Sequence, residues 1–365
     1  MTALANSVDY PARPLRSLQA GQWVKLICGA SYQDMPTIRS LVMIYALADV
    51  DCIDLAADLA VVTAARQGLA DAQVGLDSPN RPWLMVSLND GEDPHFRKAS
   101  FDSTACPQTC PQPCVTICPT AAIDLSEPIG PGVLPQLCYG CGRCLTICPV
   151  GQIVAQSYQV RPEDLPAELW SQIDAIEIHT QTGHHTNFQQ LWQRLQPWIG
   201  QLKLISISCP DHPQVVDYLQ YLYSIMAPLS LPLIWQTDGR PMSGDLGKGT
   251  THATLRLAQK LLTANLPGYV QLAGGTNHHT VRKMLNLGLV EPDSRETIDS
   301  AVAPLTTPTV AGIAYGSYAR TLVLSSLESD RPGPLSPATL APQLRQARRL
   351  VGQLKSRNTE DFTDL

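Results

Sequence analysis

The sequence predicts an α/β protein, a (β/α)8 barrel into which a small α+β domain is inserted. Three observations lead to this prediction. Short β-rich segments alternate with helical ones, eight cysteines gather in one interval, and glycine-rich turns follow the last two strands. Alternation of strand and helix over this length indicates a parallel sheet. Eight strands favour a closed barrel, and a doubly wound open sheet is the alternative.

Each predicted strand is a short apolar run that a helical segment follows. The strands cover 23–31, 51–58, 82–90, 174–180, 202–208, 231–239, 268–276 and 308–317. One helix is predicted over 35–48, where a proline stands in the first turn, another near 162–172, and the last within 339–355. These elements divide the chain into four parts: barrel 1–100, insert 101–158, barrel 159–356 and a polar tail 357–365.

The composition is that of an ordinary globular protein. Of its 365 residues, 44% are hydrophobic and 16% charged, which suits one large and one small domain. A net charge of -6 gives no basic surface for nucleic acid. The apolar run at 41–48 is far too short to span a membrane, and the N-terminus does not resemble a signal peptide. We therefore expect a cytoplasmic protein, in which clustered thiols bind metal rather than form disulfides.

The second half of the cysteine cluster has a specific spacing. In "LCYGCGRCLTICPVG" (137–151) the pattern is C-x2-C-x2-C-x3-C-P, the bacterial ferredoxin run. Two-residue gaps wrap three thiolates around one face of an iron–sulfur cubane, and the fourth cysteine ligates the other cluster. Zinc is the alternative, but its C-x2-C pairs normally come without a third and fourth cysteine in this rhythm.

The first half, "ACPQTCPQPCVTICP" (105–119), is a stretched copy with the pattern C-x3-C-x3-C-x3-C-P. Its four-residue rhythm is near a helical turn, but the prolines between the cysteines count against a helix through the run and favour a folded loop. Both halves end in "TICP", which predicts an internal repeat. By the crossed ferredoxin rule, one [4Fe–4S] cluster takes Cys106, Cys110, Cys114 and Cys148, and the other takes Cys118, Cys138, Cys141 and Cys144. A three-iron cluster is the alternative for the wider run.

The insert follows the third strand, so in a barrel it occupies a βα-loop on the face where active sites lie. Either its clusters pass electrons to a ligand at the barrel mouth, or the loop merely tolerates an insertion. The turns after strands seven and eight resemble the phosphate site of flavin-binding barrels. The candidate ligand residues there are Gly274, Gly275, Gly316, Ser317 and Arg320. The alternative is that the glycines simply permit tight turns.

Polar residues elsewhere on the rim have less specific signals. His179, at the end of strand four, is expected to be a solvated loop residue, with proton donation to a bound quinone or flavin as the alternative. Asp54 and Asp58 either face the mouth or begin the following helix. Three cysteines outside the cluster, Cys28, Cys52 and Cys209, lie in apolar strands and are expected to be buried.

The combination of the "CPQTCPQPCVTICPTAAIDL" run, "DCIDLAAD" and the ending "GGTNHHT…GIAYGSYAR" resembles the cyanobacterial light-dependent period proteins over essentially the whole chain. The resemblance implies an iron–sulfur protein of the circadian input pathway. Such a protein senses cellular redox state, and hence light, and contacts clock and clock-input proteins. The eight clustered cysteines are the ligands that the resemblance implies.

Three functions remain open from the sequence, and it does not decide whether the protein is an enzyme. The first is a redox sensor that adjusts the clock period, which needs no substrate site. The second is a flavin- or quinone-dependent oxidoreductase whose clusters relay electrons to the barrel mouth, which needs a site near Gly275 and Gly316. The third is an electron-transfer or assembly subunit of a larger complex, which predicts co-purification with that complex.

Overall fold

The structure is a computed structural model, and it describes residues 12–75, 78–126, 130, 132–239, 249–290, 309–324 and 340–356. The polar tail predicted at 357–365 lies outside the described residues. Within the described part of the chain, no helix is both long and apolar enough to cross a membrane.

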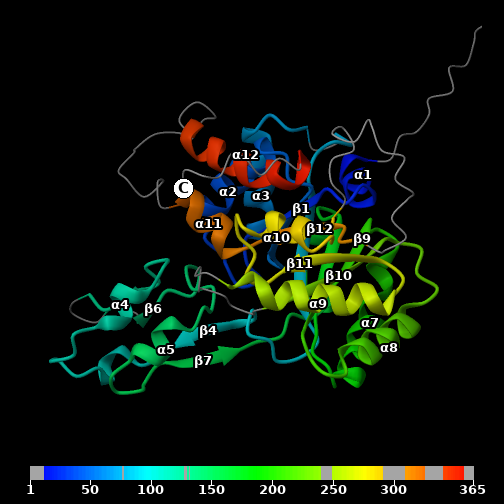
Figure 1. Ribbon diagram of the computed structural model, residues 1–365. Helices are drawn as coiled ribbons and strands as arrows, with labels where there is room; N and C mark the ends of the chain where they lie inside the picture. Colours follow the sequence, from blue (N-terminus) through cyan, green and yellow to red (C-terminus); the bar gives the residue numbers. More distant parts are fainter. Residues whose placement is uncertain are drawn as a thin grey trace, which may run out of the picture.

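Eight parallel strands close into a barrel, which confirms the predicted fold and shows the open-sheet alternative to be wrong (Figure 1). They are β1 (Trp23–Ile27), β2 (Cys52–Ala56), β3 (Trp83–Asn89), β8 (Ala175–His179), β9 (Leu204–Pro210), β10 (Leu233–Asp238), β11 (Tyr269–Ala273) and β12 (Gly312–Tyr315). Neighbours in space follow chain order, and β1 pairs with β12 to close the ring. Each strand lies within the range predicted for it, apart from β9, which continues to Pro210.

Helices surround the barrel as the alternating pattern predicts (Figure 1). They are α2 (Met35–Leu47), α3 (Leu59–Asp71), α6 (Ala167–Trp170), α7 (His185–Ile199), α8 (Val215–Met226), α9 (Thr251–Ala264), α10 (Thr280–Asn286), α11 (Ser317–Leu324) and α12 (Ala341–Lys355). The helix predicted near 162–172 is divided into a 3-10 turn, η2 (Pro162–Asp164), and α6, because Pro166 interrupts it. Helix α11, directly after β12, was not predicted, since it is only two turns long.

The two ends of the barrel interior differ in character. The amino-terminal end is apolar: Trp23 and Trp83 meet edge to face with ring centroids 5.9 Å apart. The short helix α1 (Arg13–Gln19) packs Leu18 into this cluster. Towards the carboxyl ends of the strands the interior becomes polar, with Lys25 and Glu177 both fully buried. Because buried charges need partners, this polar end of the barrel is the candidate location of a functional site.

The insert leaves the barrel after β3 and returns before β8, and it projects to one side at lower left in Figure 1. Its stem is the antiparallel pair β4 (Arg97–Ser100) and β7 (Val154–Ser157). Beyond the stem lie η1 (Ser103–Ala105), α4 (Pro113–Ile117), α5 (Arg143–Ile147) and the pair β5 (Ile123–Asp124) with β6 (Gly132–Val133). A small core of its own joins Ala122, Ile123 and Ile153 to the clustered cysteines.

The insert also contacts the loop that follows β1. The Lys98 ammonium donates to the Gln33 side-chain oxygen at 2.6 Å. The backbone N–H of Gln33 donates to the Gln136 backbone carbonyl at 3.1 Å. Tyr139 meets Tyr32 edge to face, with centroids 6.2 Å apart. These contacts bring the second cysteine run against the carboxyl-terminal mouth of the barrel.

Candidate functional site

The two cysteine runs have the same local backbone. Helix α4 follows Gln112 and α5 follows Gly142, both in the left-handed conformation with φ of 50° and 75°. Each helix ends at an extended cysteine, Cys118 and Cys148, with ψ of 114° and 115°. The repeat seen in the sequence is therefore a repeat of structure. The first run is its more strained copy, because a left-handed conformation costs a non-glycine residue about 1–2 kcal/mol.

A cavity of about 350 Å³ lies among the cysteines of the second run. The thiols that line it come from both runs: Cys118, Cys138, Cys141 and Cys144. Backbone amides point at two of these sulfurs, from Ala99 to Cys138 at 3.4 Å and from Ala122 to Cys118 at 3.2 Å. Four thiols around one hollow, with N–H donors to the sulfurs, suit an iron–sulfur cluster.

The other four thiols form a second group. Burial raises the pKa of Cys106, and its neighbours Cys110 and Cys148 add to the rise. Burial likewise raises the pKa of Cys114; backbone hydrogen bonds oppose the rise, while Cys106 and Cys110 reinforce it. Each group thus takes one thiol from the other run, the grouping that the crossed rule predicts. Which thiols bind metal remains a prediction.

The environment of the thiols favours binding of a cation. Burial, followed by the nearby Cys141, Cys138 and Cys118, raises the pKa of Cys144 to about 12. At neutral pH such crowded thiols keep their protons unless a metal neutralises them. Cys148 differs: burial opposes ionisation, but backbone amides of the stretch 150–153 outweigh it and lower the pKa. Its sulfur therefore ionises, and so ligates, more readily than those of Cys106 and Cys114.

A second cavity, of about 760 Å³ with its open mouth included, lies at the carboxyl-terminal end of the barrel. All five residues predicted for a phosphate site line it: Gly274, Gly275, Gly316, Ser317 and Arg320. Tyr139 lines this cavity and the thiol cavity as well. The two candidate sites therefore share one side chain as a common wall.

Some of these five residues have structural roles that need no ligand. Gly275 has φ of 94°, and a Cβ there would lie 2.4 Å from the Thr250 carbonyl oxygen. The Arg320 guanidinium donates to the carbonyls of Ile27 at 3.0 Å and Cys28 at 2.8 Å. It also lies over the Tyr139 ring, 4.8 Å from the centroid. Arg320 thus joins the end of β1 to the insert, and the tight-turn explanation suffices for Gly275.

A chain of buried polar contacts crosses the barrel beneath the cavity. Lys25 forms an ion pair with Glu177. Glu177 accepts a hydrogen bond from Gln236 at 2.6 Å, and Gln236 accepts one from Gln271 at 2.5 Å. Gln271 in turn accepts from the Trp23 indole at 2.6 Å. Burial would raise the pKa of Glu177, but the Lys25 ammonium and His179 together outweigh it and lower that pKa. The contacts hold the carboxylate ionised and in place.

Asp54 faces the cavity, while Asp58 begins the next helix, so each aspartate takes one of the two expected roles. The Ser87 hydroxyl donates to Asp54 at 2.8 Å. Burial, with Glu177 adding to it, raises the pKa of Asp54 to about 6. Asp58 instead accepts from the backbone amides of residues 60 and 61 as the N-cap of α3.

His179 is not the solvated rim residue that was expected. It is 5% exposed, and it lies beside His95 with ring centroids 4.8 Å apart. Neighbouring His184 is half-buried and hydrogen-bonds Asp90 at 2.9 Å. Direct alternation along β8 turns both Glu177 and His179 into the barrel, and the closed ring excludes water from them. Cys28, Cys52 and Cys209 are buried, as expected.

Sequence reasoning missed several residues of the mouth. Lys25 and Glu177 had a signal, since each is a lone charge inside an otherwise apolar strand. Asp93 and His95 had none, because their segment matches no motif, and Tyr139 lies within the second cysteine run at a position that the motif does not specify; all three meet the barrel only through the fold.

The fold and the thiol groups define a class of protein, a (β/α)8 barrel with a cysteine-rich cluster-type insert in its third βα-loop. Two family models match the chain. "Light dependent period A C-terminal domain" covers residues 169–353, and "LdpA Fe-S cluster-binding domain" covers residues 106–159. A curated relative, "Light dependent period A" of Synechococcus elongatus, is 53% identical over 347 residues, or 94% of each chain.

The chain belongs to the light dependent period A family. The resemblance stated from the sequence is thereby confirmed. The chain carries an iron–sulfur cluster-binding domain, which favours iron–sulfur over zinc for the clustered cysteines.

Proposed function

We propose that residues 101–158 form a ferredoxin-type unit that holds two [4Fe–4S] clusters with interleaved ligands. One cluster takes Cys106, Cys110, Cys114 and Cys148, and the other takes Cys118, Cys138, Cys141 and Cys144. The main support is the cavity of the second run, where a thiol from the first run completes a set of four. The matching backbone of α4 and α5 supports the same arrangement for the other cluster, that of Cys106, Cys110, Cys114 and Cys148.

The clusters serve as a redox sensor that adjusts the period of the circadian clock to light. The relative's name, "Light dependent period A", supports a role in a light-dependent period. The clusters gain and lose electrons with the cellular redox state, and the change of charge is passed to clock and clock-input proteins in the cytoplasm. Tyr139, shared by the thiol cavity and the barrel mouth, gives the barrel a direct contact with one cluster.

The surface of the insert supports contact with other proteins. Several large apolar side chains are exposed on it, namely Val115, Ile117, Ile147, Val150 and Val154, which are 37–52% exposed. Exposed apolar side chains that gather in one small unit are typical of interaction sites. They flank the fourth cysteine of each run, so a docked protein would lie close to the clusters.

Iron analysis and EPR of anaerobically prepared protein test the cluster assignment. We expect about eight irons per chain, four for each cubane. Cys118→Ser should remove the cluster of the second run although Cys118 belongs to the first run, and the EPR signal of the reduced first cluster should persist. Cys28→Ala, which changes a buried thiol directly after β1, is the matched control and should leave the spectrum unchanged. Unaltered iron content in Cys118→Ser contradicts the crossed assignment.

The sensing role has its own test. Cells whose only copy carries Cys118→Ser together with Cys148→Ser should lose the dependence of clock period on light intensity, while cells with Cys28→Ala keep it. A normal light response in the double variant, with the clusters shown to be absent, contradicts the sensor.

The barrel-mouth cavity favours a second candidate function, in which the clusters deliver electrons to a bound flavin, quinone or other phosphate-bearing ligand. The observation behind it is that all five predicted ligand residues line one cavity. Gly316→Val is the better probe, because a Cβ at Gly316 meets only the Ile27 Cβ at 3.8 Å, whereas Gly275 is needed for the turn. A flavin or quinone that co-purifies with the protein and is lost in Gly316→Val supports this function; protein free of organic cofactor contradicts it.

A further inference from the structure

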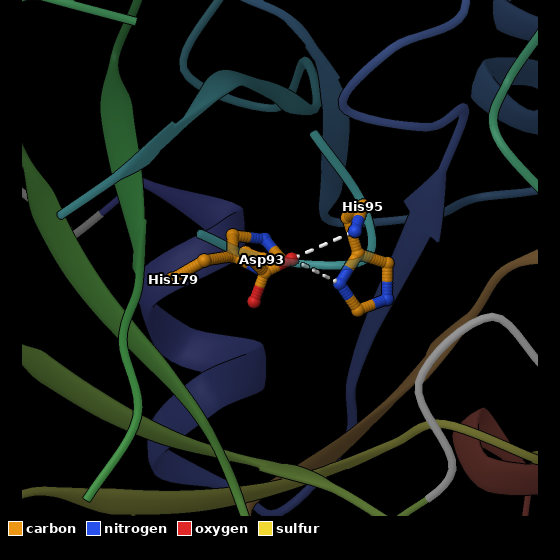
Figure 2. A group of neighbouring side chains, drawn as sticks. All are labelled: Asp93, His95 and His179. Carbon is orange, nitrogen blue, oxygen red and sulfur yellow. Dashed lines mark hydrogen bonds and ion pairs between the residues drawn. The ribbon is translucent and has the colours of Figure 1, made fainter. Parts of the chain in front are cut away.

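Three side chains converge where the insert joins the barrel: Asp93, His95 and His179. Asp93 and His95 lie in the segment between β3 and β4, and His179 ends β8. Figure 2 shows the Asp93 carboxylate between the two imidazole rings. One ligand atom from each of the three lies within 4.8 Å of the others.

The separations suit a single metal ion. The Asp93 carboxylate lies 2.8 Å from Nδ1 of His95 and 3.7 Å from Nδ1 of His179. Two further carboxylates lie beside the outer ring nitrogens: Glu177 is 3.3 Å from Nε2 of His179, and Asp238 is 3.7 Å from Nε2 of His95. Two ligands bound at about 2.1 Å to one tetrahedral ion lie roughly 3.4 Å apart. The two separations at Asp93, 2.8 Å and 3.7 Å, lie on either side of that spacing, and the shorter one is a hydrogen bond that a bound ion would replace.

His179 is a buried side chain, 5% exposed, whose two ring nitrogens make no aligned hydrogen bond with a described residue. A buried imidazole normally has a partner for at least one nitrogen. Glu177, 3.3 Å from Nε2, is within reach of a poorly aligned hydrogen bond, whereas Asp93, 3.7 Å from Nδ1, is too far for one and leaves that nitrogen available to an ion.

The charge of the mouth points the same way. Three carboxylates line it, Asp54, Glu177 and Asp238, and Asp93 lies beside His95 and His179; all four are almost fully buried. The permanently charged cations among the described residues beside them are Lys25 and Arg320, which balance two of the four, so the rest falls to protonated His95 and His179 or to a metal ion in place of their protons. A divalent cation between the histidines balances the rest without two protonated imidazoles side by side.

We propose that Asp93, His95 and His179 bind a divalent transition-metal ion at the barrel mouth, separate from the iron–sulfur clusters. Two imidazole nitrogens and a carboxylate favour ions such as Zn²⁺, Mn²⁺ or Fe²⁺ over Ca²⁺ or Mg²⁺, which prefer oxygen ligands throughout. Glu177 and Asp238 lie at the opposite ring nitrogens, Nε2 of His179 and of His95, where they accept hydrogen bonds from the ligands.

The position of the site gives the metal a consequence for the fold. His179 belongs to the rigid barrel, while Asp93 and His95 belong to the segment that enters the stem of the insert. A bound ion therefore fastens the base of the insert to β8. Since the ligands come from outside the cysteine runs, this site is independent of the cluster assignment.

Zinc is the probe that tests the site in protein with intact clusters. Anaerobically prepared protein is treated with EDTA, its iron content is checked, and it is dialysed against micromolar ZnCl2. We expect one zinc per chain with no loss of iron, and zinc K-edge absorption that gives nitrogen and oxygen ligands at about 2.0–2.1 Å rather than sulfur at about 2.3 Å.

Variants locate the ion. His95→Gln and His179→Gln should each weaken zinc binding more than tenfold, while His184→Gln, the matched control at the same rim, should bind as the parent does. Unchanged iron content and melting temperature show that each variant is folded. Failure to bind zinc or Mn²⁺ with clusters intact, sulfur ligands in the absorption spectrum, or equal affinity in all three variants would overturn the proposal.

Discussion

Gly140, in the second cysteine run, occupies a position where a side chain does not fit. Its φ is 74°, and a Cβ there would lie 2.2 Å from the Arg97 carbonyl oxygen. The Gly140 carbonyl in turn accepts a hydrogen bond from the Arg97 side chain at 3.2 Å. Arg97 is the first residue of β4. Gly140 therefore allows the loop that lines the thiol cavity to pack closely against the stem of the insert.

We expect Gly140→Ala to lose the second-run cluster, because the backbone must shift away from Arg97 and carry Cys138 and Cys141 with it. Iron per chain after anaerobic reconstitution should fall by about half, the share of one of two cubanes. Gly151→Ala is the control: Gly151 also has positive φ, at 65°, but no described atom lies within 4 Å of its Cβ position. Its left-handed backbone costs about 1 kcal/mol and no more. Equal loss of iron in both variants contradicts the steric explanation.

At the scale of elements, α12 is fixed to the amino-terminal end of the barrel by a buried ion pair. The ammonium of Lys355, its last residue, lies 2.6 Å from Asp51 and 3.1 Å from the Ser17 hydroxyl. Asp51 is fully buried and also accepts from the Val24 amide at 2.9 Å. Burial raises the pKa of Asp51 even though Lys355 opposes the rise.

Lys355→Met should lower the free energy of unfolding by about 2 kcal/mol, because it leaves the buried Asp51 charge without its nearest partner. Loss of the ammonium raises the folded-state pKa of Asp51 further above its unfolded value. The native state then binds more protons than the unfolded state, so stability falls as pH rises. The deficit should be larger at pH 8 than at pH 5.5 in chemical unfolding. Lys355→Arg should lose little, and a deficit that does not change with pH contradicts this account.

The elements were largely predictable because buried parallel strands are continuous apolar runs, as "WLMVSLN" of β3 illustrates. The short elements were not. Helices α1 and α11 are too short for their periodicity to be distinguished from loop. The stem strands β4 and β7, "RKAS" and "VAQS", pair on the outside of the core, so no apolar pattern marks them.

For the whole molecule, the barrel and the insert meet at Arg320 and Tyr139. Arg320 comes from α11, beside the barrel mouth, and Tyr139 stands between two cysteines of the second run. A positive charge close to a cluster favours its reduced form. We therefore expect the barrel to influence the reduction potential of a cluster in the insert through this contact.

Arg320→Gln should lower the reduction potential of the second-run cluster, by a shift on the order of tens of mV from the lost positive charge. Redox titration followed by EPR measures it. Arg143→Gln, whose side chain lines the thiol cavity itself, should produce a shift of the same sign, and the remote Arg161→Gln should produce none. A potential that moves with Arg143 but not with Arg320 would show that the two parts are electrostatically independent.

The same scale explains which site residues the sequence revealed. The interleaved thiols could be predicted because an internal repeat such as "TICP" records the pseudo-symmetry of a local unit. The histidine and aspartate cluster could not, because His95 and His179 are separated by the whole insert and meet only when the barrel closes. A local repeat can be recognised from the spacing of residues in the sequence, whereas contacts across a barrel become apparent only from its topology.

The antiparallel stem of the insert bears on how the chain folds. Strands β3 and β8 are neighbours, yet Leu84 and Asp174, which bond across them, are 90 positions apart. The entropy lost on closing a loop grows with its length. Once Arg97 pairs with Ser157, the barrel has to close only the two short segments that flank the stem. We therefore expect early assembly of the insert to ease closure of the barrel, so that the supply of iron and sulfide to the nascent chain would influence its folding rate.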